Sequence, residues 1–280
     1  MTREQNIALA ARLIREADGL LIGAGAGIGI DSGLPDFRGD HGFWRAYPAL
    51  GKAGISFYDA ASPATFESNP RLAWGFYGHR LDLYRKTVPH DGFRMLRKIA
   101  ARLRHGAFVF TSNVDGQFQK AGFAAGRIDE CHGSIHHLQC LGACTPKIWP
   151  ADEFIPEVDM ERCELLCDPP RCPVCDGIAR PNILMFGDWN WVQHREMQQA
   201  GALAEWCDTV RNPAVIELGA GTGIPSVRNF CEQMRRPLIR INPREPKLDG
   251  ARGIGLAMGA LDALGAIHAA LDGTKFFTET

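Results

Sequence analysis

Residues 20–29 read LLIGAGAGIG, and they are the strongest indication of the fold class. A short apolar run that opens into a glycine-rich turn is typical of a buried strand leading into the phosphate-binding loop of a nucleotide-binding α/β protein. Gly25, Gly27 and Gly29 would let the backbone approach a pyrophosphate closely. The strict G-x-G-x-x-G fingerprint is absent, because the sixth position counted from Gly25 is Ile30. A glycine turn needed only for tight packing therefore stays an alternative.

The sequence on either side of this stretch continues the α/β pattern. Thr2 and Gln5 form a T-x-x-Q capping box, which predicts a helix that stops before Gly19. Three further short apolar runs are followed by Gly, Asn or Ser, as buried parallel strands often are, and they are residues 108–111, 214–218 and 238–241. We therefore expect an α/β fold built on a Rossmann-like parallel sheet.

Two stretches interrupt this pattern and predict a second, smaller domain. Residues 41–92 are rich in aromatic residues at helical spacing and predict a helical insertion. Residues 138–180 hold six of the nine cysteines with little periodicity and predict a zinc-binding module. The expected Rossmann-like domain then consists of residues 1–40, 93–137 and 181–280.

Charge and cysteine content limit the class of protein. The 280 residues include 31 Lys plus Arg and 32 Asp plus Glu, so the formal net charge is −1. This balance excludes an overall polycation, although a local basic patch stays possible, and we expect neither nucleic acid nor a membrane as a partner. Nine cysteines, an odd number, argue against a fully paired disulfide framework. No signal-peptide pattern and no uncharged apolar run of ~18 residues is present, so we expect a cytoplasmic protein.

The residues that follow the glycine loop resemble those of a known family. Residues 31–39 read DSGLPDFRG and set a carboxylate, an aromatic ring and a guanidinium just beyond the loop. Together with the preceding G-A-G, this run resembles the signature of the sirtuins, the NAD-dependent protein deacylases, in their bacterial type. The resemblance implies NAD as the cofactor, with contacts at Gly25, Ala26, Gly27, Asp36, Phe37 and Arg38.

Five further blocks follow in the family's order between residues 111 and 243. They read TSNVD from Thr111, CHGS from Cys131, RPNILMFGD from Arg180, GTG from Gly221 and INP from Ile241. The resemblance implies further NAD contacts at Ser112, Asn113, Val114, Asp115, Gly221, Thr222, Asn242 and Pro243. It implies contacts with the acylated lysine of a protein substrate at Phe186 and Gly187.

His132 is the candidate general base. It stands at a turn between Cys131 and Gly133, and histidine suits proton transfer near neutral pH. The resemblance implies that the acyl oxygen of a modified lysine attacks C1′ of the nicotinamide ribose and displaces nicotinamide, with His132 as base on the ribose hydroxyls. It implies that Asn113 binds the ribose and orders a water, and that Asp115 holds the adjoining loop. The expected products are free lysine, nicotinamide and O-acyl-ADP-ribose.

Four cysteines form two closely spaced pairs. Cys172 and Cys175 make a C-x-x-C hook, and Cys140 and Cys144 make a looser C-x-x-x-C, which together suit tetrahedral thiolate coordination of Zn²⁺. The sirtuin family carries a structural zinc at this place in the chain. The fourth ligand is the least certain by spacing, since Cys163 or Cys167 could replace Cys144.

Two residues of the helical insertion bear on the type of acyl group that the protein would accept. Tyr77 and Arg80 are three residues apart and so share a helix face, where a phenol and a guanidinium could hold a carboxylate. Class III sirtuins, which remove succinyl, malonyl and glutaryl groups, carry a Y-x-x-R motif in this region. The resemblance therefore implies that acidic acyl-lysines are accepted; a surface pair beside a packed tyrosine is the alternative.

The chain departs from the family pattern at several positions, including Gln117 and Phe118, where Leu and His are usual. Gly29, Ser112, Asp188 and Gly223 stand where Ser, Gln, Glu and Ser are usual. Because loop contacts are altered, an ADP-ribosyltransferase or NAD glycohydrolase using His132 stays an alternative, as does a non-catalytic NAD-binding sensor. We expect an NAD-dependent protein-lysine deacylase.

Overall fold

The computed structural model describes residues 2–35, 39–248 and 252–278. Asp36, Phe37 and Arg38, three of the predicted NAD contacts, lie outside the described residues. Among the described residues, no helix is both long and apolar enough to cross a membrane.

The large sheet has six strands in the order β11-β10-β9-β1-β2-β3, and all neighbours are parallel. The strands are β1 (Gly19–Ala24), β2 (Ala107–Thr111), β3 (Ile128–Glu130), β9 (Pro213–Leu218), β10 (Leu238–Ile241) and β11 (Gly253–Leu256). The predicted parallel sheet is confirmed. The sequence indicated the four central strands and missed the two at the edges.

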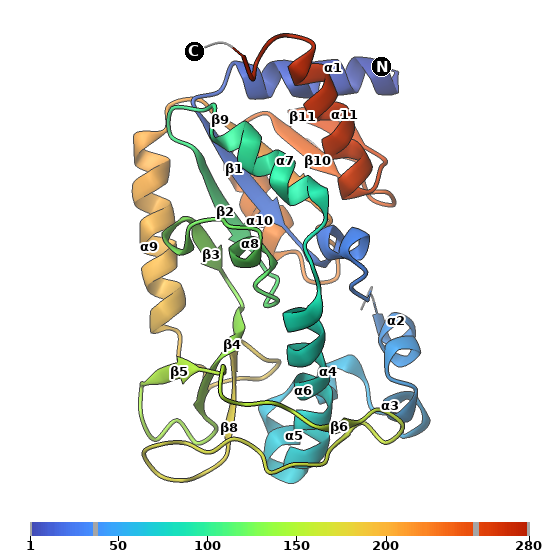
Figure 1. The fold of residues 1–280 in the computed structure, drawn as a ribbon, viewed down its shortest axis with the longest axis vertical. Helices are drawn as coiled ribbons and strands as arrows, with labels where there is room; N and C mark the ends of the chain where they lie inside the picture. The colour runs from blue at the N-terminus through green and yellow to red at the C-terminus, as the bar shows by residue number, and fades with distance from the viewer. Residues whose placement is uncertain (1, 36–38, 249–251, 279–280) are drawn as a thin grey trace.

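Helices cover both faces of this sheet (Figure 1). The helices are α1 (Arg3–Arg15), α7 (Asp91–Ala100), α8 (Gln117–Lys120), α9 (His194–Thr209), α10 (Ser226–Gln233) and α11 (Ala260–Asp272), with 3₁₀ turns η1 (Ala26–Ser32) and η2 (Ala125–Arg127). The predicted first helix begins as expected, since the hydroxyl of Thr2 accepts from the backbone N–H of Gln5.

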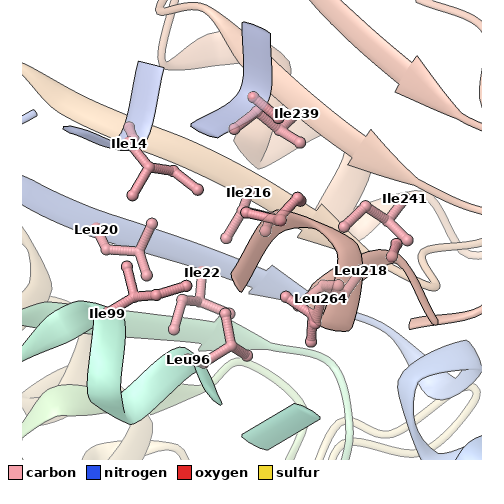
Figure 2. Packing of buried hydrophobic residues seen from close by; sticks show 14 of the residues in the cluster. Ile14, Leu20, Ile22, Leu96, Ile99, Ile216, Leu218, Ile239, Ile241 and Leu264 are labelled. Atoms are coloured by element: carbon pink, nitrogen blue, oxygen red, sulfur yellow. The ribbon is translucent and has the colours of Figure 1, made fainter. Parts of the chain in front are cut away.

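The alternation of strand residues builds two cores. Because successive side chains point to opposite faces, Leu20 and Ile22 of β1 pack with α1, α7 and α11. Figure 2 shows this cluster, in which Ile216 and Ile239 of the neighbouring strands meet Ile14 of α1. Leu21 faces the other way, against α9 and α10. Each fully buried aliphatic side chain contributes about 1.5–3 kcal/mol.

A smaller part lies beyond the carboxyl ends of the sheet, in the lower half of Figure 1. Its helices are α2 (Gly39–Ala46), α3 (Pro48–Lys52), α4 (Phe57–Ala60), α5 (Pro63–Ser68) and α6 (Pro70–Lys86). Its strands are β4 (Gly133–Cys140), β5 (Ile148–Pro150), β6 (Val158–Asp159), β7 (Glu164–Leu165) and β8 (Ala179–Ile183), in sheets β5-β4-β8 and β6-β7. The predicted helical insertion and cysteine module therefore share one apolar core.

Strands β4 and β8 connect the two parts of the molecule. The predicted domain boundaries at 137/138 and 180/181 fall inside these strands. The exact domain limits stay a prediction. The arrangement places the loops after β1, β2, β9 and β10 at the junction with the smaller part, which is where open α/β sheets bind ligands.

Candidate active site

Two glycine loops meet backbone to backbone at the carboxyl ends of β1 and β9. The backbone N–H of Gly25 donates to Leu218 (2.9 Å), and that of Gly27 donates to Gly219 (3.0 Å). A Cβ on Gly219, where φ is +61°, would lie 2.4 Å from the Gly27 backbone, and one on Gly25 would lie 2.8 Å from Cα of Ala220. Tight packing therefore requires glycine at Gly25 and Gly219.

The loop after β2 is tied to the first glycine loop. Thr111 donates through Oγ1 to the carbonyl of Ala24 (2.8 Å) and accepts from the backbone N–H of Asn113 (3.0 Å). The Nδ2 of Asn113 donates to the carbonyl of Gly25 (3.1 Å). The backbone N–H of Ser112 donates to Ala24 (3.2 Å). The structure thus brings Asn113 and the Gly25 loop together.

His132 lies between the β2 loop and the start of α10. Its Nε2 is 3.2 Å from Oγ of Ser226, the first residue of α10. Burial lowers the pKa of His132 below its ordinary value near 6.5, and the backbone carbonyl of Ser112, which hydrogen-bonds the ring, partly opposes this. In the neutral tautomer whose proton faces the Ser112 carbonyl, Nε2 is unprotonated and accepts from the Ser226 hydroxyl. Burial thus favours a neutral imidazole, and its Nε2 faces Ser226.

The side chain of Asp115 lies apart from Asn113 and His132. Its Oδ1 accepts from the backbone N–H of Gln117 (2.9 Å), which begins α8, and its carbonyl lies 3.0 Å from Nε2 of His136. Among the described residues, no hydrogen bond links its carboxylate to Asn113 or His132. The residue lines a cavity of about 570 Å³, together with His136 and Arg195 among others. Burial raises the pKa of Asp115 to about 6.

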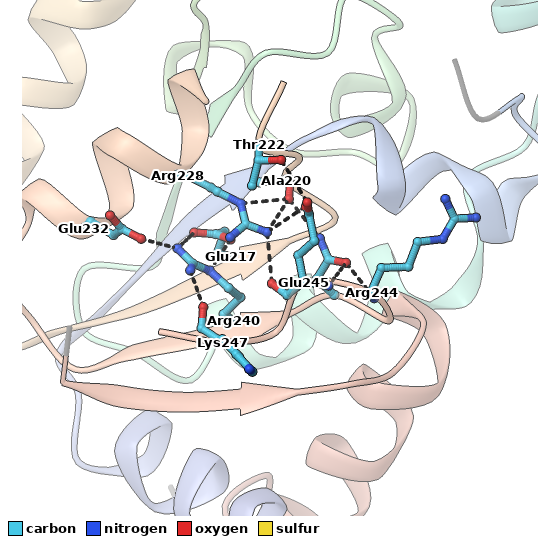
Figure 3. Close-up of polar contacts among 10 residues, drawn as sticks. Glu217, Ala220, Thr222, Arg228, Glu232, Arg240, Arg244, Glu245 and Lys247 are labelled. Atoms are coloured by element: carbon cyan, nitrogen blue, oxygen red, sulfur yellow. Dashed lines mark hydrogen bonds and ion pairs between the residues drawn. The ribbon is translucent and has the colours of Figure 1, made fainter. Parts of the chain in front are cut away.

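A polar clamp holds the loop after β9 (Figure 3). Arg228 of α10 donates to the carbonyl of Ala220 through Nε (3.2 Å) and Nη2 (3.1 Å), and it pairs with Glu245 (3.1 Å). Thr222 donates to Glu245 (2.8 Å), and Nδ2 of Asn242 donates to Ala220 (2.8 Å). The predicted contacts Thr222 and Asn242 therefore belong to one hydrogen-bonded network around the loop after β9.

Two further predicted contacts lie in the same loops. Gly221 follows Ala220 and Pro243 follows Asn242. A Cβ on Gly221 or Gly223 would meet nothing within 4 Å, so this edge of the loop is open. A ligand phosphate or ribose would therefore find free backbone here.

A buried ion pair supports the clamp from below (Figure 3). Arg240 of β10 is 1% exposed, and its Nε and Nη2 atoms donate to the two carboxylate oxygens of Glu217 of β9 at 2.7 and 2.9 Å. It also pairs with Glu232 of α10 at 2.6 Å. Bidentate pairing fixes these elements relative to one another. The position of α10, and so of Ser226, is set by this pair.

Tyr77 and Arg80 lie together in an aromatic box within α6. Cζ of Arg80 lies 5.6 Å from the ring centroid of Tyr77 and 5.1 Å from that of Phe76. Its Nε donates to the hydroxyl of Tyr84 (3.0 Å). Burial raises the pKa of Tyr77 to about 12, against the opposing charge of Arg80. The predicted pair is therefore a buried phenol–guanidinium pair and not a surface pair.

The loop after β8 holds the two predicted substrate contacts. The backbone N–H of Phe186 donates to Ala61 (3.0 Å), and its ring stacks on Tyr58 with centroids 4.6 Å apart. Gly187 takes a φ of +66°, which favours glycine. Asp188, the shortened residue of the motif, makes a fully buried ion pair with Arg180 at 2.7 Å. This pair closes the loop beneath Phe186.

Four cysteines gather at one point of the smaller part. The Sγ atoms of Cys140, Cys144, Cys172 and Cys175 all lie within 4.8 Å of one another. Two of the separations are 3.7 Å (Cys140 to Cys175) and 3.6 Å (Cys144 to Cys172). Tetrahedral Zn²⁺ with Zn–S bonds of about 2.3 Å requires sulfurs about 3.8 Å apart. The cluster fits a structural zinc.

The other two cysteines of this module lie elsewhere. Cys163 is fully buried, and a Cβ on Gly75 of α6 would lie 2.1 Å from its carbonyl oxygen. Cys167 directs its sulfur to the carbonyl of Ile155 (3.9 Å). The structure thus brings Cys144 into the cluster and neither of its two alternatives.

Some residues of this site match no sequence motif. Ser226 follows the G-T-G block by three positions and matches no motif. Arg228 and Glu245 are separated by 17 residues, and only the fold brings them together. A signal that could have found Arg228 is its i, i+3 spacing from the apolar Cys231, because an arginine on a buried helix face needs a partner.

Comparison with known proteins agrees with this geometry. A model of the Sir2 family matches residues 25–212. The NAD-dependent protein deacylase of Aeropyrum pernix is 28% identical over 258 residues, covering 90% of this chain and 92% of the relative. That of Aquifex aeolicus is 31% identical over 164 residues, which is 59% of each chain. Among solved structures, a Sir2 homologue in complex with NAD has a TM-score of 0.70 at 21% identity, covering 94% of this chain and 93% of the other.

Proposed function

Because this chain belongs to the Sir2 family, we propose that it is an NAD-dependent protein-lysine deacylase with His132 as its general base. Family membership and relatives that are NAD-dependent protein deacylases support the reaction class. The observation that carries the assignment of the base is the neutral, half-buried imidazole of His132, held at the carboxyl edge of the sheet.

His132 has the protonation state that a general base needs. Burial disfavours its charged form, so the ring stays neutral near pH 7. The hydrogen bond to the Ser112 carbonyl fixes the proton on the nitrogen away from Ser226. The basic nitrogen can take a proton from a hydroxyl group at this edge of the sheet when that hydroxyl replaces Ser226 as its partner.

The loops around His132 are suited to NAD. We assign NAD contacts to the described parts of the four loops, at Gly25, Ala26, Gly27, Ser112, Asn113, Val114, Asp115, Gly221, Thr222, Asn242 and Pro243. Their close backbone packing and the open edge at Gly221 support this assignment. When bound, NAD supplies a ribose carbon that carries a good leaving group, nicotinamide. Asn113 is held by its bond to Gly25 and would orient the ribose or a water.

Asp115 has a positioning role in this proposal. Its carboxylate caps α8, and its backbone carbonyl binds His136 on β4. These contacts fix the chain that follows Asn113. The same strand β4 begins one residue after His132. Asp115 thus connects the two chain segments that carry Asn113 and His132.

Tyr77 and Arg80 would set the acyl preference. The guanidinium of Arg80 is buried beside the phenol of Tyr77, and this supports an acidic acyl group because a buried cation binds a carboxylate strongly. Phe186 and Gly187 would flank the acylated lysine of the protein substrate. We therefore propose that succinyl, malonyl or glutaryl groups are removed as well as acetyl groups.

We assign the zinc ligands to Cys140, Cys144, Cys172 and Cys175. A zinc ion there would hold the two cysteine hairpins together and would take no part in the reaction. Four thiolates require a reducing compartment, which supports a cytoplasmic location. No role in this proposal requires nucleic acid or a membrane.

The experiment that tests the reaction uses an acetyl-lysine and a succinyl-lysine peptide, each with and without NAD. We expect deacylated peptide only when NAD is present. We expect the His132→Ala variant to lose about 100-fold or more of kcat/KM. Full activity of His132→Ala would contradict the assignment of the base.

ADP-ribosyl transfer or NAD hydrolysis at the same site is the second candidate. The changes at Gly29, Ser112 and Gly223 remove or replace side chains at the loops assigned to NAD. Free ADP-ribose or a modified protein as the main product would support this reading.

A further inference from the structure

The chain contains a basic segment, although its net charge is near zero. Between Asp91 and Asp129, residues 92–128 hold seven of the 31 Lys and Arg residues and one of the 32 acidic residues. That acid is Asp115, which is buried. The rest of the chain therefore has 31 acidic and 24 basic residues. Such segregation produces a local positive potential on an otherwise acidic molecule.

Part of this segment forms a groove at the amino-terminal end of β2. The groove has a volume of about 530 Å³, and its charged lining residues are Arg97, Arg104 and Arg127, with His105 beside them. Among the described residues, no carboxylate lines it. The end of α7, the start of β2 and the turn η2 contribute these side chains. In Figure 1 the end of α7 and the start of β2 lie at the side of the sheet away from the smaller part.

The arginines are available and one of them is preorganised. Arg104 and Arg127 are exposed, and their guanidinium groups have no hydrogen bond or ion pair to any described residue. Arg97 donates to the carbonyl of Ala121 (3.0 Å) and lies over Gly122, where a Cβ would be 2.7 Å from its Nη1. The nearby carboxylate of Asp18 is occupied by the backbone N–H groups of Arg211 and Asn212.

We propose that this groove, named here the arginine groove (Arg97, Arg104, Arg127), docks an acidic segment of the protein substrate. Guanidinium groups bind carboxylates through two parallel hydrogen bonds. The floor between them consists of Ala, Gly and the half-buried Phe123, which admits the aliphatic stems of glutamates. A short acidic peptide contacts this groove alone, whereas a long nucleic acid would also meet the acidic remainder of the molecule.

The groove is separate from the candidate active site. Loops at the carboxyl ends of the strands form that site, and the groove lies at the other end of β2. The five residues of β2 span about 16 Å at ~3.3 Å per residue. A substrate that reaches both places therefore needs a linker of more than four residues, since four extended residues span at most about 14 Å. This inference rests on the proposed deacylase function only for the identity of the partner as a substrate.

Direct binding is the first test and needs neither NAD nor an acyl group. The probe is a fluorescent peptide of eight glutamates, measured by anisotropy at low and at 0.5 M salt. We expect the triple variant Arg97→Gln/Arg104→Gln/Arg127→Gln to weaken binding about tenfold or more, and high salt to abolish it. The control variant Lys52→Gln/Lys147→Gln/Arg162→Gln removes three exposed charges from the smaller part and should change the affinity less than about twofold. Equal weakening by both variants would overturn the proposal.

A second variant and a competitor complete the binding test. Arg104→Gln/Arg127→Gln spares the Arg97–Ala121 hydrogen bond, so a loss of binding in this variant cannot come from misfolding of the Gly122 turn. A thymidine octanucleotide that binds this groove more tightly than the glutamate peptide would overturn a polypeptide partner in favour of nucleic acid.

Turnover tests the link to substrate. Acyl-lysine peptides carry the eight glutamates behind a Gly/Ser linker of either 4 or 20 residues; a 20-residue linker has a mean reach of about 25 Å. For the wild type, we expect the KM of the long-linker peptide to be about fivefold lower than that of the short-linker peptide, because the short linker cannot reach the groove. For the triple variant, we expect the two KM values to be equal. An equal effect of both linkers would refute docking at the groove. Absence of turnover with every peptide would instead count against the proposed function, while the binding result would stand.

Discussion

The Nε2 atom of His132 and the hydroxyl oxygen of Ser226 are 3.2 Å apart, although 94 residues separate them in the chain. Ser226 begins α10, and α10 is fixed to the sheet by Glu232, which pairs with Arg240. A hydroxyl on the unprotonated nitrogen stabilises the orientation of the ring. The ion pair between Arg240 and Glu232 therefore helps to position His132, because it holds α10 and Ser226 of α10 contacts the imidazole ring.

Replacing Ser226 tests this connection. The Ser226→Ala variant should lose about fivefold to tenfold of kcat/KM, as expected for one hydrogen bond, while Ser226→Thr should retain most of the activity. Steady-state deacylation of an acetyl-lysine peptide measures both. Wild-type rates in Ser226→Ala would mean that Ser226 has no influence on His132.

The pH dependence follows from the pKa of His132. Burial lowers this pKa below about 6.5, and the base acts only when deprotonated. Activity should therefore be constant through neutrality and fall as the pH drops through a midpoint below 6.5. A profile of kcat/KM from pH 5 to pH 9 measures the midpoint. An acid limb centred above pH 7 would be incompatible with a buried neutral imidazole as the base.

Replacing Arg80 tests the acyl preference. Arg80→Met keeps an unbranched apolar side chain of about the length of the arginine stem and removes the guanidinium charge, so kcat/KM for a succinyl peptide should fall about 10–100-fold relative to that for an acetyl peptide. Arg80→Lys retains the charge and is the matched control. If Arg80→Met changes both substrates equally, Arg80 supports the fold and does not select the acyl group.

Metal content tests the cysteine cluster. The wild type should bind one zinc per chain, and Cys144→Ser should lose zinc and several degrees of melting temperature. Cys167→Ser is the control, because its sulfur contacts Ile155 and lies outside the cluster. Metal analysis and thermal denaturation measure both variants. Zinc loss in Cys167→Ser with full zinc in Cys144→Ser would reverse the ligand assignment.

Asp129 should make the protein less stable at high pH. The residue is 1% exposed, and its Oδ1 has no hydrogen-bond partner among the described residues. Burial, followed by Glu196 and Glu130, raises its pKa to about 7. Because the folded pKa is raised, the stability present at low pH is lost as the pH rises through about 7.

The Asp129→Asn variant removes this penalty. It should gain about 1–3 kcal/mol at pH 8 and clearly less at pH 5, measured by denaturant unfolding at both pH values. Asp152→Asn, which changes an exposed carboxylate, is the control. An equal gain at both pH values would show that ionisation of Asp129 is not the cause.

Local patterns were sufficient to predict the central sheet and the cysteine cluster. The strands β1, β2, β9 and β10 are apolar runs, and two short cysteine spacings define the sulfur cluster. The edge strands escaped prediction for physical reasons. β3 contains Asp129 and Glu130, and β11 contains Gly253 and Gly255, so neither resembles an apolar strand.

The tertiary contacts of the site could not be predicted from local patterns. Whether Tyr77 and Arg80 are buried depends on the packing of α6 against the rest of the smaller part. The bond between His132 and Ser226 depends on how α10 is placed by Arg240, and the orientation of Asp115 depends on the capping of α8. Contacts between segments far apart in the chain are set by the fold as a whole.

The most direct test of the account is the identity of the products formed from NAD and an acylated peptide. Mass spectrometry should detect nicotinamide, deacylated peptide and O-acyl-ADP-ribose in equal amounts from the wild type and none from His132→Ala. Free ADP-ribose without O-acyl-ADP-ribose, or an ADP-ribosylated peptide that keeps its acyl group, would contradict deacylation as the function of this site.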